Sequence, residues 1–290
     1  MKKFAVGVLV FALVAAMAPA AFAEPTFSGY VLQSIEYRFG DLQDDATTPD
    51  DESKPYTFGK TTLRVNISGN VGENLSYYGR IQGTGNSNPT VTLAYGDIKN
   101  FGVEGLSFRI GRQSISWTSL NSFDGLFSET RDAVSASYSA DAVGFNAFYS
   151  PSAVATAIDP FDGDLFGARV TYGTDVNGFA IDLGGQLLKE LADDGKLGYG
   201  VGATVGLSSF GDAYLEWGKN VDETDFLVIG SNIAVLEDAT GISAWVEYDV
   251  EGEEFAFELS RKLFDGFTAY FGSDDSAETF YLKGEFQVSF

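Results

Sequence analysis

The stretch that decides the fold is Phe280–Phe290, FYLKGEFQVSF. The two sets of alternating positions differ in polarity: the even ones are Phe280, Leu282, Gly284, Phe286, Val288 and Phe290, and the odd ones are Tyr281, Lys283, Glu285, Gln287 and Ser289. Successive side chains of a β-strand point to opposite faces, so one face of this strand is apolar and the other is polar. The segment predicts a strand that separates an apolar environment from a hydrated one.

The same alternation recurs towards the N-terminus. Leu63, Val65 and Ile67, for example, alternate with Arg64 and Asn66. Charged residues within the predicted strands lie opposite the apolar face, namely Glu36, Arg38, Lys60, Arg64, Arg80, Glu247 and Glu258. A soluble β-sandwich or solenoid with one polar face is the alternative, but a protein core does not explain charges in the middle of strands. Repeated segments of about ten residues with this period predict an all-β, antiparallel transmembrane barrel, because only helices or closed barrels pair every backbone group in lipid.

The alternation and the turn residues between segments predict sixteen strands. They span 25–39, 56–69, 75–85, 90–98, 105–114, 132–140, 143–151, 164–173, 178–189, 197–207, 211–219, 224–234, 241–250, 253–262, 266–272 and 277–290. Short junctions such as 175–178 and 264–266 resemble tight turns. The segment 224–234 alternates poorly, which leaves fourteen strands as an alternative. Either count is even, as single-chain bacterial barrels require.

The N-terminal residues have the pattern of a secretory signal peptide. Lys2 and Lys3 precede the apolar stretch 4–19, and Ala21 and Ala23 occupy the small-residue positions of a cleavage site. We expect residues 1–23 to be a cleaved signal peptide and residues 24–290 to be one barrel domain. A retained anchor is the alternative, but the apolar stretch is short for a span of about 20 residues. The sequence therefore predicts export from the cytoplasm.

Composition excludes several classes of function. The formal net charge is −23, which disfavours nucleic acid as a partner. The chain contains no Cys and no His, so we expect no thiolate metal site and no cofactor. The known barrel hydrolases depend on histidine, and no compact pair of acids suggests a glycosidase. We therefore expect a protein that is not an enzyme.

A more specific pattern lies between residues 93 and 150. The segments 93–98 and 106–113, the latter ending in Gly-Arg-Gln, are followed by the non-alternating stretch 114–129 and then by a hairpin that begins at Arg131. This order resembles the fourth to seventh strands of the general (non-specific) outer-membrane porins of Gram-negative bacteria. The C-terminal strand also resembles theirs, in which the final Phe belongs to an assembly signal; the corresponding residues here are Phe286, Val288 and Phe290.

The resemblance implies a passive channel for small hydrophilic solutes and ions, with a loop after the fifth strand folded into the lumen. An acidic loop would face a basic wall across the constriction; the candidate residues are Arg64, Arg80, Arg109, Asp124, Glu129 and Arg131. It also implies a homotrimer in the outer membrane, in contact with lipids and lipopolysaccharide and dependent on the barrel-assembly machinery.

Three further points remain hypotheses. Acidic residues exceed basic ones on the other polar faces, which predicts a mild preference for cations. A structural or adhesive barrel without an open pore is the alternative function, although the glycines at 198, 200 and 202 on the polar face favour an open lumen. The Asp-rich segment 41–52 either recruits divalent cations or is simply solvated; its spacing fits no EF-hand loop.

Overall fold

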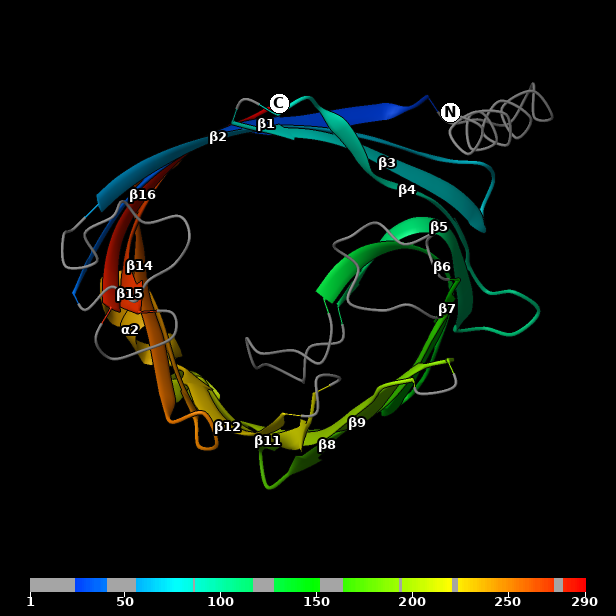
Figure 1. The fold of residues 1–290 in the computed structure, drawn as a ribbon. Helices are drawn as coiled ribbons and strands as arrows, with labels where there is room; N and C mark the ends of the chain where they lie inside the picture. Colours follow the sequence, from blue (N-terminus) through cyan, green and yellow to red (C-terminus); the bar gives the residue numbers. More distant parts are fainter. Residues whose placement is uncertain are drawn as a thin grey trace.

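The chain forms a closed, all-β barrel of sixteen antiparallel strands (Figure 1). The computed structural model describes residues 24–40, 56–85, 87–116, 128–151, 164–192, 195–220, 224–273 and 279–290. The strands are β1 Thr26–Gly40, β2 Tyr56–Asn70, β3 Leu75–Thr84, β4 Thr90–Ile98, β5 Leu106–Ser116, β6 Ser128–Ala140, β7 Val143–Ser150, β8 Leu165–Val176, β9 Phe179–Glu190, β10 Leu197–Gly206, β11 Asp212–Lys219, β12 Asp225–Asn232, β13 Ile242–Asp249, β14 Glu254–Phe264, β15 Phe267–Ser273 and β16 Thr279–Ser289.

Each strand pairs with its neighbours in sequence, and β1 closes the ring by pairing with both β2 and β16. Ile35 at the middle of β1 lies opposite Gly284 of β16 and Gly59 of β2. At the end of the seam, the backbone amides of Gly29 and Phe290 each donate to the other's carbonyl oxygen at 3.0 Å. The sheet therefore has no free edge at the junction of the first and last strands.

The two faces of the sheet have the polarity that the alternation predicts. The convex outer face exposes large apolar side chains, among them Ile35 at 57%, Val201 at 55% and Phe286 at 45%. Residues one position away, such as Ser34 and Lys283, face the lumen and are less exposed. The polarity is thus inverted relative to a water-soluble domain, since apolar residues cover the outside.

The tight turns lie where the sequence predicts them. The turn between β8 and β9 places Asn177 and Gly178 at φ 57° and 84°. Positive φ at two central residues is the geometry that joins twisted antiparallel strands most directly, and Gly and Asn adopt it at the lowest cost. The β6–β7 and β14–β15 junctions are likewise two-residue turns.

The weakly alternating segment 224–234 is one strand, β12, followed by a short helix, α2 Ala234–Thr240. The helix ends at Gly241, which adopts the left-handed conformation at φ 68° and donates its amide to the carbonyl of Glu237. The alternation is weak because the lumen-facing residues Phe226 and Val228 are apolar and buried, so both faces of the strand carry apolar side chains. The fourteen-strand alternative is therefore wrong.

Strands β5 and β6 run further into the stretch 114–129 than the sequence predicts, to Ser116 and from Ser128. The middle of the predicted inward loop, residues 117–127, lies outside the described residues. The predicted signal peptide 1–23 and the Asp-rich segment 41–52 also lie outside them.

Candidate functional site

The candidate site is the lumen wall, and its basic part lies on β2 and β3. Nε of Arg64 donates to Gln82 Oε1 at 2.8 Å, and the Arg64 guanidinium lies 4.8 Å from the centre of the Tyr30 ring. Arg80 donates to Asn66 Oδ1 at 3.1 Å and to the Tyr78 hydroxyl at 2.9 Å. Within the described ranges, neither arginine forms an ion pair with a carboxylate. Neutral partners thus hold both guanidiniums in place while leaving their charge uncompensated.

Arg109 differs from these two arginines. Its Nε and Nη2 donate to the two carboxylate oxygens of Asp97 at 2.7 and 3.2 Å, and its guanidinium lies 4.0 Å from the centre of the Tyr95 ring. The bidentate pair with Asp97, one strand away on β4, neutralises the positive charge of Arg109. The sequence predicts that this charge belongs to the basic side of the constriction. Asp97 is a lumen residue that the sequence reasoning did not single out.

The paired ends of β5 and β6 leave the barrel wall. Pairing of β4 with β5 stops at Arg112, and pairing of β6 with β7 stops at Val134, whereas β5 and β6 stay paired out to Ser116 and Ser128. In Figure 1 this ribbon curves into the ring. Pairing with β4 ends one residue beyond Gly111, which has φ 126° and where a side chain would meet the carbonyl oxygen of Ala94 at 2.3 Å.

The ribbon carries two of the predicted constriction residues. Arg131 is 6% exposed and is therefore buried. The backbone of Glu129 pairs with Ile115, which is 5% exposed and packs in an apolar cluster with Ala133, Phe148, Leu165 and Leu188. Asp124 lies outside the described residues. The cluster anchors the ribbon against the inner wall, because its members come from β5 to β9.

Three glutamates on the other part of the wall each accept a hydrogen bond from a tyrosine. The hydroxyls of Tyr214, Tyr281 and Tyr270 donate to Glu247, Glu258 and Glu285 at 2.7, 2.7 and 2.9 Å respectively. Glu285 also lies 3.5 Å from the ammonium group of Lys283. Tyrosines therefore position both signs of lumen charge, by stacking beneath arginines and by donating to glutamates.

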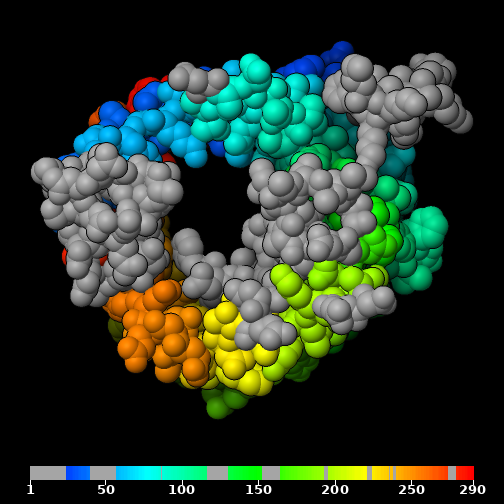
Figure 2. Space-filling view, viewed as in Figure 1, coloured from blue at the N-terminus to red at the C-terminus, as the bar shows by residue number. Residues whose placement is uncertain are grey.

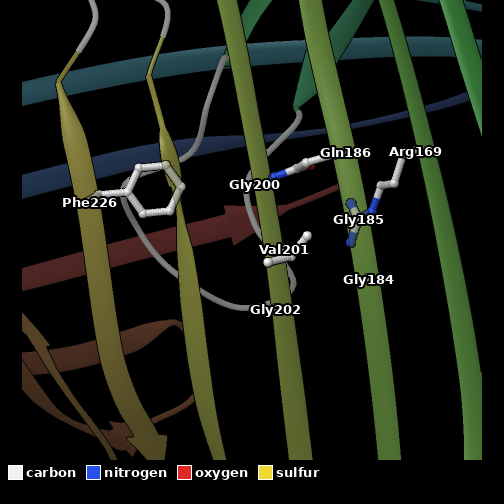
Figure 3. Close-up of a pocket in the computed structure, with 8 residues that line it drawn as sticks. All are labelled: Arg169, Gly184, Gly185, Gln186, Gly200, Val201, Gly202 and Phe226. Carbon is white, nitrogen blue, oxygen red and sulfur yellow. The ribbon is translucent and has the colours of Figure 1, made fainter.

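The glycine-rich part of the wall is covered by side chains of the next strands. A Cβ at Gly200 or Gly218 would meet the Phe226 ring at 3.3 and 2.6 Å, and one at Gly202 would meet Glu216 Cγ at 2.8 Å. Figure 3 shows the Phe226 side chain of β12 reaching over β11 towards Gly200 of β10, with Gln186 and Arg169 on the strands beyond β10. The expectation that these glycines widen the lumen is met only in part, because Phe226 and Glu216 occupy the space.

The described residues contain neither a membrane-spanning helix nor a cluster of metal-binding side chains. No helix among them is long and apolar enough to cross a membrane. The same part of the chain contains no group of three or more acidic residues arranged to hold a metal ion.

The closed even-stranded barrel, apolar outside and charged inside, is the architecture of outer-membrane channel proteins.

Comparison with solved structures identifies the fold more narrowly. Two variants of the Rhodopseudomonas blastica porin match with TM-scores of 0.63 and 0.62, each at 14% identity and over 92% of this chain and 100% of the porin chain. A structure concerned with the asymmetric conductivity of engineered proteins matches with a TM-score of 0.62, 15% identity and the same coverage. No protein-family model and no curated protein matches the chain. The chain has the porin fold.

Proposed function

We propose that this chain is a porin of the bacterial outer membrane, through which small hydrophilic solutes and ions diffuse passively. The observation that carries the proposal is a closed barrel with an apolar outer face and a charged lumen. The space-filling view shows an opening through the middle of the molecule (Figure 2). The outer face suits lipid, since a closed sheet leaves no backbone group unpaired there. The match to porin structures supports the expectation that the chain is not an enzyme.

We place the constriction where the β5–β6 ribbon enters the ring. Arg64 and Arg80 supply a basic wall without ion-pair partners among the described residues. Glu129 at the start of β6 and Asp124 in the segment before it supply the acidic side. Opposed charges across a narrow aqueous passage create a transverse field that orients dipolar solutes and disfavours apolar ones. The inward curve of the ribbon in Figure 1 supports this placement.

The proposed porin function also implies which molecules the barrel contacts. Lipids and lipopolysaccharide would contact the outer face, and a homotrimer would bury part of it. Phe286, Val288 and Phe290, exposed by 45%, 52% and 61% on that face, would present the C-terminal signal to the assembly machinery. Residues 1–23 would direct export and be removed.

The test is single-channel recording in planar bilayers with the purified mature chain. In symmetric KCl we expect stepwise, ohmic increases in current, because the lumen is open and polar. A properly folded barrel that gives no steps would contradict a channel and would favour a structural or adhesive barrel instead.

A salt gradient across the same bilayer tests ion selectivity. Lumen-facing acids such as Glu258, Glu285 and Asp182 outnumber the bases, so we expect a reversal potential of the sign that denotes a mild preference for K⁺ over Cl⁻. A reversal potential of the opposite sign would show that the arginines of β2 and β3 dominate the field.

A further inference from the structure

The β5–β6 ribbon is tied to the barrel wall at its base by the side chain of Gln113. This glutamine is 3% exposed and is the first residue of β5 beyond the pairing with β4. Its Nε2 donates to the carbonyl oxygen of Ala133 at 2.9 Å and to that of Arg109 at 3.5 Å. Its Oε1 accepts a hydrogen bond from the Ser135 hydroxyl at 2.8 Å. The carboxamide therefore has a partner for each of its N–H groups and for its oxygen.

Two of these partners lie on the part of the sheet that is still in the wall. Arg109 pairs with β4, and Ser135 pairs with β7. Four residues of extended strand, the separation of Arg109 and Gln113, cover about 13 Å, which is longer than a glutamine side chain. The bonds therefore form only while β5 is bent, and they link the ribbon to the wall across the inner side of the bend.

Two further contacts hold the ribbon beyond the bend. The Ser150 hydroxyl of β7 donates to the carbonyl oxygen of Asp132 at 2.9 Å, past the end of the β6–β7 pairing. Ile115 packs in the apolar cluster with Phe148 and Leu188 of the wall. Apolar contact has no preferred direction, whereas hydrogen bonds have a defined geometry. The polar contacts at the base thus fix the angle of the ribbon, and the cluster holds it close to the wall.

We propose that Gln113 is a positioning residue that sets the width of the channel by holding the ribbon in its inward curve. The ribbon lies inside the ring in Figure 1, so the angle at its base decides how much of the lumen stays free. The inference gives a role to the last residue of the Gly-Arg-Gln motif. It rests on the proposed channel function, because the width matters only if solutes pass.

Cysteine labelling measures release of the ribbon without any current. The chain contains no cysteine, so Ile115→Cys places a single thiol in the apolar cluster, at a position that is 5% exposed. A water-soluble maleimide reaches this thiol when the ribbon leaves the wall, and the labelling rate therefore reports the released fraction. We expect a second substitution, Gln113→Leu, to speed labelling about twentyfold, a factor of about five for each of the two short hydrogen bonds.

Ser135→Ala and Ser137→Ala form a matched pair on the lumen face of β6. Ser135 donates to Gln113, whereas the Ser137 side chain forms no hydrogen bond within the described ranges. In the Ile115→Cys background we expect Ser135→Ala to speed labelling about fivefold, the effect of one bond, and Ser137→Ala to leave the rate unchanged. Equal rates in these two variants would overturn the role of the Gln113 bonds, even if Gln113→Leu fails to fold.

Polymer exclusion in single channels tests the width itself. Poly(ethylene glycol) of increasing mass is added to symmetric KCl, and the smallest polymer that no longer lowers the conductance gives the exclusion limit. We expect Gln113→Leu to conduct more and to admit larger polymers than wild type, and Ser137→Ala to match wild type. Heat-modifiable migration on SDS gels verifies that each variant is a closed barrel.

The possible outcomes separate the inference from the channel function. A Gln113→Leu barrel with wild-type labelling would overturn the inference. Faster labelling with an unchanged exclusion limit would also overturn it, because the ribbon would then be held by Gln113 without setting the width. Both results leave a channel that conducts KCl. Absence of KCl steps from the wild type would overturn the channel and the width together, whereas the labelling rates would still measure the tie.

Discussion

Replacing Ile35 with lysine is expected to lower the free energy of unfolding of the barrel in lipid by about 2–4 kcal/mol, the cost of a cation on the lipid face near the midplane. Ile35 is 57% exposed on the outer face, and its partner Gly284 lies at the middle of β16. The charge would therefore have to enter hydrocarbon or distort the bilayer around it. Urea titration of the barrel in phospholipid vesicles, followed by tryptophan fluorescence, measures the difference.

Ser34→Lys is the matched control, because it places the same charge one residue away on the lumen face, between Glu285 of β16 and Lys60 of β2. We expect its unfolding free energy to stay within about 1 kcal/mol of wild type, because interactions between hydrated charges are weak and the acid and the base act in opposite directions. Equal losses in the two variants would mean that the two faces of β1 meet the same environment.

Gly29→Val is expected to destabilise the barrel by about 3 kcal/mol, at the upper end of the usual cost of overpacking. A Cβ at Gly29 would lie 2.2 Å from the carbonyl oxygen of Arg64 and 2.7 Å from the Phe290 ring. Either β1 moves away from β2, or Phe290 leaves the seam that closes the ring. The fraction of folded barrel on unboiled SDS gels over a urea series reports the loss.

Gly59→Val provides the comparison for this change. Gly59 lies on the same outer face, but a Cβ there finds its nearest neighbour at 3.7 Å, so the added side chain has room. We expect this variant to fold as well as wild type. If Gly59→Val were as damaging as Gly29→Val, the loss of glycine itself and not the contact at the seam would be responsible.

The barrel could be predicted from the sequence because its main signal is local. Alternation within a segment such as 280–290 fixes which side chains share a face, whatever the neighbouring strand is. The helix α2 was missed because its seven residues are too few to establish a helical period beside a strand. The extensions of β5 and β6 were missed because the ribbon leaves the wall, and the alternation there no longer separates an apolar medium from a hydrated one.

The charged wall could be predicted only in part. The lumen orientation of Arg64 and Arg80 follows from alternation, but the partners of the lumen charges depend on strand register. Tyr214 and Glu247 are 33 residues apart, and Arg109 and Asp97 are 12 apart. Phe226 reaches across β11 to cover glycines of β10 for the same reason. A pattern read along one strand contains no information about such contacts across strands.

The central claim is that lipid covers one face of the sheet and water fills the space enclosed by the other. Because the chain has no cysteine, single cysteines at neighbouring positions of β8 test it directly. Val170 is 50% exposed on the outer face, and Thr171 faces the lumen. In vesicles, Thr171→Cys should react with a membrane-impermeant charged maleimide, and Val170→Cys should react only after the barrel is unfolded. Rapid labelling of Val170→Cys with protection of Thr171→Cys would contradict the account.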